Sequence, residues 1–204
     1  QSEYGVYSLS SSVIGYFALL YTGMSSTYLR YYSSYRAKGD EDSIARLNGL
    51  FLVLFSSMGL LALVLGMAMS FNLKAVLGSG LTEAELSLAK VLFVIMSVNM
   101  ALLMPKTVFA ALVIAQERFV FIKLLGVVTA ILSPVLNLIL LYQGYGSVGM
   151  SIVVLAVTVA DLLVNIWYCH FRLRCRFDFK RLPFYLLPAM FSFSVFLVLQ
   201  GICD

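Results

Sequence analysis

One lysine lies inside an apolar stretch where its charge needs an explanation: Lys106, directly after Pro105 in "ALLMPKTVF", residues 101–109. Lysine is almost never fully buried without a partner, and a lysine at the middle of a bilayer costs several kcal/mol. Counting back from Arg118 at roughly 1.5 Å per residue places Lys106 about 18 Å from the edge of its apolar segment, too deep for snorkelling. Lys106 is therefore a candidate cation on a substrate path.

The chain offers one acidic residue at a comparable depth. Asp161, in "VADLLVN", lies about 12 Å from the end of its own apolar segment. In one interpretation Lys106 and Asp161 form a buried ion pair that only orients two helices. Three asparagines would then hydrogen-bond between helices: Asn99, Asn137 and Asn165. In the other interpretation the pair lines a hydrated cavity, and Pro105 loosens the helix and frees a carbonyl near position 101.

The cysteines and the acidic string do not make a metal site. Three cysteines and one histidine occur in the chain: Cys169, Cys175, Cys203 and His170. Zinc requires four ligands at characteristic spacings, so these are interpreted as ordinary thiols near a membrane edge, with no metal. The string "GDEDS", residues 39–43, is expected to be a solvated turn in which Asp42 and Ser43 are the N-cap residues of the next helix.

Nucleotide binding and enzymatic chemistry are not expected either. "GYGSVG", residues 144–149, has the spacing of a dinucleotide fingerprint, but it joins two apolar segments, where Gly144 and Gly146 suit a tight turn and Gly149 opens the next helix. The apolar segments contain no paired carboxylates or histidine for acid–base work. We therefore expect neither an enzyme nor a cofactor, and the composition does not imply nucleic acid.

The elements that position these residues follow from hydropathy. Of the 204 residues, 61% are hydrophobic and 12% charged, which indicates a membrane protein, because about a quarter charged is usual for soluble domains. About twenty apolar residues cross a bilayer. Five segments reach that length and a sixth follows: residues 5–29, 47–71, 87–116, 119–142, 148–169 and 183–202. The predicted fold class is an all-α, polytopic transmembrane helix bundle.

The loop charges alternate along the chain. Lysine and arginine concentrate in residues 30–46, 117–123 and 170–182, whereas residues 72–86 contain only Lys74 and residues 143–147 contain neither. The positive-inside rule predicts the three basic loops in the cytoplasm and residue 1 outside. Four tyrosines at the end of the first segment are expected to anchor it at the interface as an aromatic belt: Tyr28, Tyr31, Tyr32 and Tyr35.

Three stretches resemble the oligosaccharide flippases of the MATE-like multidrug/oligosaccharidyl-lipid/polysaccharide exporter superfamily. They are "SEYGVYSL", "GMSSTYLRYYSSYRAKGDEDSIARLNGLF" and "AQERFVFIKLLG". The resemblance implies that residues 1–169 are helices two to six of an N-terminal lobe in a two-lobe transporter of 12–14 helices. Residues 170–182 would be a basic cytoplasmic linker and residues 183–204 the start of the seventh helix, so the chain is expected to be a fragment.

The resemblance also implies a function and partners. Such flippases move an undecaprenyl-pyrophosphate-linked oligosaccharide across the bacterial inner membrane by alternating access, and work with polysaccharide assembly proteins. Lys106 would then meet the pyrophosphate, and Arg30 would help to capture it at the cytoplasmic mouth. The alternatives are a cation-coupled multidrug exporter of the same superfamily, which needs carboxylates such as Asp161, a membrane-embedded polysaccharide polymerase or glycosyltransferase, and a non-transporting scaffold.

Overall fold

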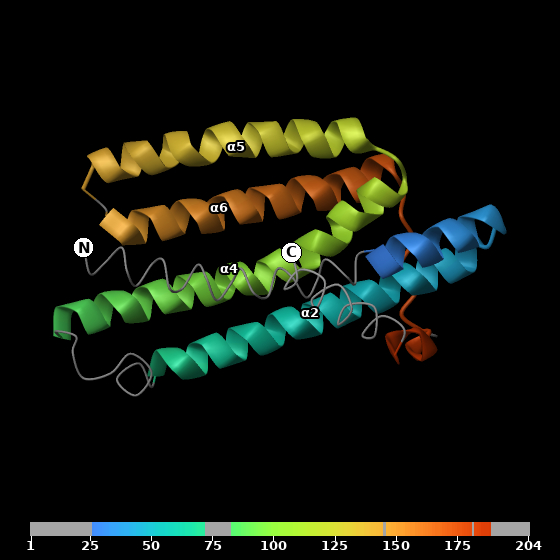
Figure 1. Cartoon of the computed structure of the whole chain (residues 1–204), viewed down its shortest axis with the longest axis horizontal. Helices are drawn as coiled ribbons and strands as arrows, with labels where there is room; N and C mark the ends of the chain where they lie inside the picture. The colour runs from blue at the N-terminus through green and yellow to red at the C-terminus, as the bar shows by residue number, and fades with distance from the viewer. Residues whose placement is uncertain (1–25, 72–82, 145, 181, 189–204) are drawn as a thin grey trace, which may run out of the picture.

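The described chain is built from helices. The computed structural model describes residues 26–71, 83–144, 146–180 and 182–188. Residues 26–37 are helical. The elements that follow are α2 (Glu41–Phe71), α4 (Glu83–Ala115), α5 (Phe119–Tyr142), α6 (Gly146–Trp167), the π-helical turn η1 (Tyr168–Arg172) and the 3-10 helix η2 (Phe184–Leu186), shown in Figure 1. Within those ranges there is no strand, and four helices are long and apolar enough to span a membrane. The predicted all-α transmembrane bundle is confirmed.

The helices agree with four of the predicted segments, with differences at their beginnings. α2 begins at Glu41 because Asp40 caps it: its Oδ1 accepts the Ser43 N–H at 3.0 Å, and its Oδ2 accepts the Ser43 hydroxyl at 2.6 Å. The expectation that Asp42 and Ser43 would be the caps is wrong, since both lie in the first turn. Most of the predicted segment 5–29 and most of the predicted segment 183–202 fall outside the described residues.

The turn between α5 and α6 depends on glycine. Gly144 has φ 85° and Gly146 has φ 55°, and only glycine adopts such values readily. α6 begins at Gly146, so Gly149 lies one turn inside the helix, where it is buried. The same kind of reversal closes α4 with a non-glycine residue: Glu117 has φ 61°, and the Arg118 N–H returns to the Val113 carbonyl at 3.1 Å.

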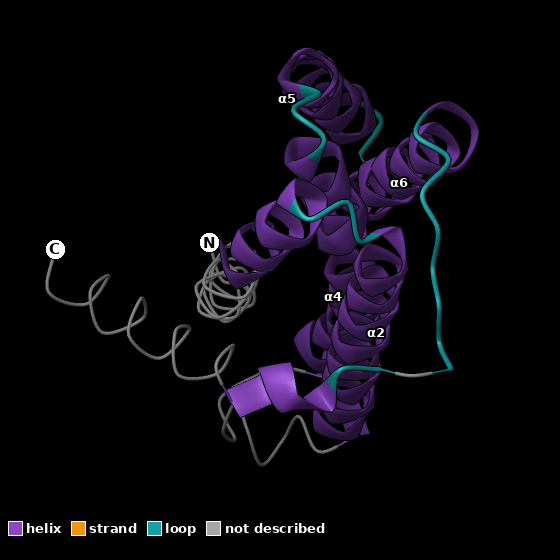
Figure 2. Ribbon diagram, turned by 90° about the vertical axis from the view of Figure 1, so that its right-hand side faces the viewer, coloured by secondary structure: helices purple, strands orange, loops and turns teal. Residues whose placement is uncertain are grey.

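α4 is the central helix of the bundle. It packs against α2, α5, α6 and η1, and α5 in turn packs against α6. The end-on view in Figure 2 shows α5 and α6 on one side of α4 and α2 on the other. α5 contains no buried residue, so most of its surface is apolar and open, as expected for a helix that faces lipid.

Glycines allow α2 and α4 to approach closely. A Cβ placed on Gly59 would lie 2.6 Å from the Ala101 carbonyl oxygen. That carbonyl precedes Pro105 by four residues, so the proline removes the N–H that would bond to it within the helix. Figure 1 shows the C-terminal part of α4 turning toward α6, as helices commonly bend at an interior proline.

Two of the four predicted interface tyrosines belong to the core. Tyr28 is 0% exposed and Tyr32 5% exposed, and the Tyr28 hydroxyl donates to Asn48 Oδ1 at 2.8 Å. Tyr28 also packs edge-on against Phe51, with ring centroids 4.7 Å apart. The aromatic-belt prediction is therefore wrong for Tyr28 and Tyr32, because their rings fill the junction between helix 26–37 and α2.

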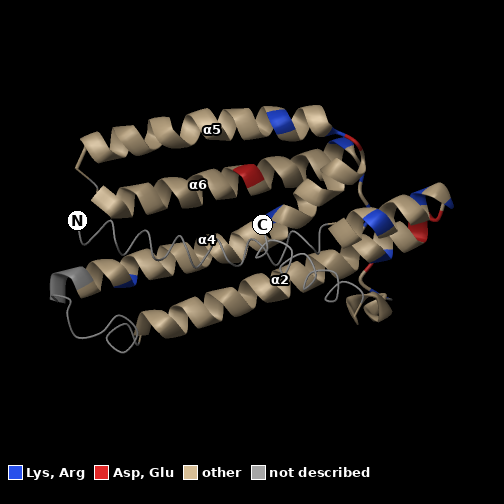
Figure 3. Cartoon of the chain, viewed as in Figure 1, with Lys and Arg blue, Asp and Glu red and all other residues tan. Residues whose placement is uncertain are grey.

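The three predicted basic loops meet at one end of the bundle, which we call the basic end. Arg36 donates to the Ala115 carbonyl at 3.4 Å, so the first loop contacts the end of α4. The Asp178 N–H donates to the Ala45 carbonyl at 2.9 Å, and Asn48 Nδ2 donates to the Arg176 carbonyl at 3.0 Å. Figure 3 shows most of the charged residues at this end. The side of the membrane on which it lies stays a prediction.

Candidate functional site

An ion pair connects α4 and α6 inside their apolar spans. Lys106 Nζ contacts Asp161 Oδ2, and the two side chains are 23% and 10% exposed, respectively. Lys106 lies in the span Leu86–Ala115 and Asp161 in the span Gly146–Arg172. A charge removed from water is stabilised by an opposite charge at contact distance, which accounts for both residues being tolerated here.

Helical periodicity places polar residues beside this pair. Asn99 precedes Lys106 by seven residues, or about two turns, and therefore lies on the same face of α4. On α6, Thr158 and Asn165 lie one turn before and one turn after Asp161, and all three are buried. The seam between α4 and α6 is thus polar at its centre, although both helices are otherwise apolar.

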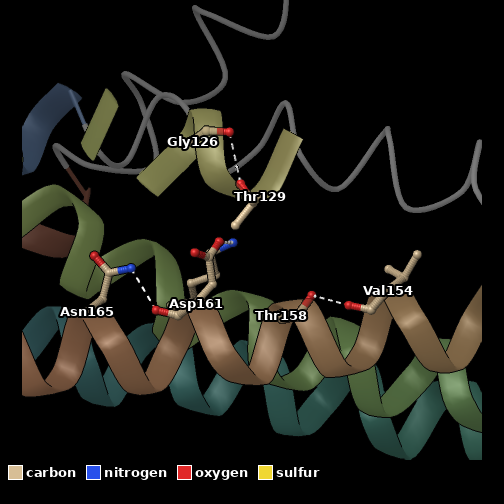
Figure 4. A network of polar contacts seen from close by, with 7 residues as sticks. Gly126, Thr129, Val154, Thr158, Asp161 and Asn165 are labelled. Atoms are coloured by element: carbon tan, nitrogen blue, oxygen red, sulfur yellow. Dashed lines mark hydrogen bonds and ion pairs between the residues drawn. The ribbon is translucent and has the colours of Figure 1, made fainter. Parts of the chain in front are cut away.

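Two hydroxyl groups near the pair, one on α6 and one on α5, donate their protons within their own helices. Thr158 Oγ1 donates to the Val154 carbonyl at 2.9 Å, and Thr129 Oγ1 of α5 donates to the Gly126 carbonyl at 3.1 Å. Figure 4 shows Thr129 above Asp161. Thr158 and Asn165 lie on either side of Asp161 along α6. A hydroxyl that donates to its own helix presents lone pairs to its surroundings, so these side chains add acceptors to the site.

Four buried side-chain oxygens have no hydrogen-bond partner in the described part of the chain. Asn99 Oδ1, Asp161 Oδ1 and Asn165 Oδ1 belong to α4 and α6 beside the pair, and Asn137 Oδ1 belongs to α5, closer to its end at Tyr142. Buried polar atoms are normally satisfied by protein or water. Asn165 Nδ2 donates to the Asp161 carbonyl at 2.8 Å, a bond within α6. The expectation that the asparagine amides bond between helices is therefore wrong for Asn165, and the carbonyl oxygens of Asn99 and Asn137 make no such bond among the described residues.

Of the other predicted positions, Arg30 lies apart from the pair and Pro105 lies next to it in α4. Arg30 is exposed on helix 26–37, and no ion pair joins it to Asp161 in the described ranges. The second lysine of α4, Lys90, was not a predicted site residue; its Nζ lies 5.3 Å from the ring centroid of Phe71, at the other end of the bundle. Pro105 is beside the pair and half-buried, so its effect on the site acts through the course of α4.

Sequence analysis missed a second polar centre, at the basic end. Asn48 is 2% exposed and bonds both Tyr28 and the Arg176 carbonyl. The only feature of the sequence that could have indicated this polar centre was an asparagine, Asn48, at the beginning of the apolar segment 47–71. Cys169 and Cys175 were interpreted as ordinary thiols, and their contact was not predicted: the Cys175 N–H donates to the Cys169 carbonyl at 3.1 Å.

The chain matches no family model, no curated protein and no solved structure. The site must therefore be interpreted from its own groups. In the described ranges it combines one partly buried cation with a set of oxygen acceptors, and the carboxylate that neutralises the cation has one oxygen without a partner. Such a site can exchange the Lys106–Asp161 contact for contacts with an ion, a charged ligand or water.

Proposed function

We propose that the chain is part of a membrane transporter that moves an anionic, lipid-linked oligosaccharide across a bilayer by alternating access. The observation that carries the proposal is the Lys106–Asp161 pair within the apolar spans of α4 and α6, beside buried oxygens that lack partners among the described residues. Charged residues at membrane depth commonly mark substrate or ion pathways.

In the proposed cycle Lys106 exchanges partners. When α4 and α6 pack as described, Asp161 neutralises Lys106 and the path is closed. When the helices separate, water solvates Asp161, and Lys106 becomes available to a phosphate oxygen of a polyprenyl pyrophosphate. Because Pro105 removes one hydrogen bond from α4, the segment around Ala101 can change direction without breaking further bonds. The substrate's charge would thereby cross the interior beside a fixed cation.

The wider assignment rests on the resemblance of the three sequence stretches. It places the protein in a bacterial inner membrane, with the described helices within helices two to six of an N-terminal lobe and a second lobe completing the cavity. Polysaccharide assembly proteins would be further partners. The reaction is a translocation without covalent chemistry, so the protein would not be an enzyme.

A specific observation favours a second candidate, a cation-coupled multidrug exporter. In the described part of the site the oxygens without partners are all acceptors, and one belongs to a carboxylate. A cationic ligand could bind Asp161 in place of Lys106, which would then withdraw along its flexible stem. The two functions predict opposite effects of removing Asp161: the exporter loses its ligand, whereas the flippase retains its cation.

Complementation of a flippase-deficient bacterial strain tests the proposal. The full-length gene is compared with Lys106→Ala, Asp161→Asn and the control Lys90→Ala, all at matched membrane abundance. We expect Lys106→Ala to reduce surface polysaccharide and to accumulate lipid-linked repeats inside the cell, with Lys90→Ala unchanged. Full activity of Lys106→Ala would show that Lys106 does not contact the substrate during transport. A strain lacking drug exporters serves as the second assay, in which loss of resistance confined to Asp161→Asn would favour the exporter.

A further inference from the structure

The end of α6 brings two cysteines together at the basic end. After η1 the chain reverses through Arg174, whose φ is 50°, and the Cys175 N–H returns to the Cys169 carbonyl at 3.1 Å. This reversal places the Cys169 and Cys175 thiols within hydrogen-bonding contact, and both are free. The six-residue separation alone does not imply this contact; the π-helical turn and the positive φ produce it.

The surroundings of Cys175 favour its thiolate. Gln116 Nε2 donates to Cys175 Sγ at 3.4 Å. The single S–H proton of Cys169 has two acceptors, the Phe109 carbonyl at 3.7 Å and Cys175 Sγ. The hydrogen bond from Cys169, followed by that from Gln116, lowers the pKa of the Cys175 thiol against the opposing effect of burial. Cys175 is also the more accessible of the two, so it is suited to be the attacking sulfur.

We propose that Cys169 and Cys175 are a redox modification site that forms a reversible intramolecular disulfide on reaction with a peroxide. The Cys175 thiolate attacks one peroxide oxygen; an S–O bond forms, the O–O bond breaks, and the alcohol or water leaves after taking a proton. Cys169 sulfur then attacks Cys175 Sγ; the S–S bond forms, the S–O bond breaks, and water leaves with the Cys169 proton. Two thiols are oxidised, one peroxide is reduced, and a thiol reductant reverses the step.

The disulfide would fix the connection between α6 and the following loop. That loop is attached to α2 by the Asp178–Ala45 and Asn48–Arg176 hydrogen bonds. A bond between Cys169 and Cys175 would therefore couple the end of α6 to α2 across the basic end. In forming it, Cys169 gives up its hydrogen bond to Phe109 on α4. The inference depends only on these contacts and is independent of what the protein transports.

The test uses the full chain in membrane vesicles, with Cys203→Ser in every variant so that only the pair is measured. Vesicles are treated with hydrogen peroxide, quenched with a maleimide and digested with trypsin without reductant. Trypsin cuts after Arg172 and Arg174, so the two cysteines lie on separate peptides. We expect a disulfide-linked peptide pair, loss of both maleimide sites together, and recovery of both with dithiothreitol.

Two variants make the result decisive. Gln116→Leu keeps both cysteines but removes the amide donor, and we expect several-fold slower disulfide formation. Cys169→Ser should leave Cys175 to overoxidise instead of forming the link. Oxidation of Cys175 to sulfinic acid in the parent without linkage to Cys169 would overturn the proposal, as would equal rates in the parent and in protein unfolded by detergent and urea.

Discussion

At the residue scale, Lys106 and Asp161 both lose water of hydration when the chain folds, and each charge is stabilised by contact with the other. We predict that Lys106→Met alone or Asp161→Asn alone destabilises the protein by about 3–5 kcal/mol, because each leaves a buried charge without its partner. The double variant Lys106→Met/Asp161→Asn should regain most of that loss. Thermal unfolding of the purified full chain in detergent measures all three, with Lys90→Met as a control for loss of a lysine at the helix end.

The double variant also separates the two interpretations of the pair. If Lys106 and Asp161 only orient helices, the double variant folds and retains transport. If Lys106 meets the substrate, the double variant folds and loses transport. Destabilisation of the double variant by the sum of the two single effects would contradict the pairing itself, since the charges would then act independently.

The solvent-exposed carboxylate of Asp40 gives a prediction about pH dependence. Hydrogen bonds from Ser43 lower the pKa of Asp40 from its ordinary value of 3.8. A lowered pKa in the folded chain means that the capping contribution is present above 3.8 and is lost as the pH falls through the lowered value. We predict that the protection of the Ser43 amide, its exchange rate measured relative to the intrinsic rate at the same pH, falls over that acidic interval.

A matched pair of variants isolates the Asp40 cap. Asp40→Asn retains an oxygen that accepts the Ser43 N–H, so protection of Ser43 should persist with a weaker pH dependence. Asp40→Ala should remove the protection at neutral pH and leave none to titrate. Unchanged exchange at Ser43 in Asp40→Ala would show that the backbone alone fixes the beginning of α2.

At the element scale, the contact between α2 and α4 depends on a missing side chain. We predict that Gly59→Ala destabilises the bundle, because its Cβ would lie 2.6 Å from the Ala101 carbonyl oxygen, a backbone atom that cannot rotate away. Overpacking typically costs about 1–3 kcal/mol. Gly126→Ala on α5 is the control, since a Cβ placed on Gly126 would meet no atom of the described chain within 4 Å, and alanine there should be neutral or stabilising.

The comparison between the two glycines is made by thermal unfolding in the same detergent. A Gly59→Ala protein as stable as the Gly126→Ala protein would show that α2 shifts to admit the methyl group. In that case the distance between α2 and α4 can change, and Gly59 does not pack rigidly against the Ala101 carbonyl.

Hydropathy predicted the elements better than their ends. Runs of about twenty apolar residues suffice to predict α2, α4, α5 and α6, because every backbone polar group must be satisfied within a membrane-spanning helix. The beginning of α2 was misplaced because Asp40, Asp42 and Ser43 are all good capping types, and only geometry selects Asp40. Tyr28 was assigned to an interface because a tyrosine suited to a belt is equally suited to a core with a hydrogen-bond acceptor such as Asn48.

At the scale of the whole molecule, the packing of α4 against α6 determines which polar groups surround the Lys106–Asp161 pair. Depth counting alone proposed Asp161 as the partner of Lys106, since both charges had to lie well inside apolar spans. It did not predict that α4 is central, or that oxygens of Asn99 and Asn165 lack partners beside the pair in the described ranges. Those features depend on how α4 and α6 are rotated about their axes, which a nearly uniform apolar sequence does not specify.

The clustering of basic loops at one end gives a topology prediction. With Cys169, Cys175 and Cys203 replaced by serine, single cysteines are introduced as Lys38→Cys at the basic end and Gln143→Cys at the opposite end. In intact cells a membrane-impermeant maleimide should label only Gln143→Cys, and after permeabilisation both, because the positive-inside rule keeps the basic end in the cytoplasm. The reverse labelling would invert the assigned orientation without changing the fold.

The attachment of the loop after α6 to the beginning of α2 also constrains the order of assembly. Asn48 and Arg176 are 128 residues apart, whereas α4, α5 and α6 are consecutive neighbours that can pair as they emerge during synthesis. Contacts of large sequence separation carry the larger chain-closure cost and form later. Until Arg176 and Asp178 have been synthesised, Asn48 Nδ2 and the face of α2 around Gly49 lack these contacts at the basic end. We therefore expect this attachment to be the final step of folding and a place where a chaperone or a second protein segment can compete with it.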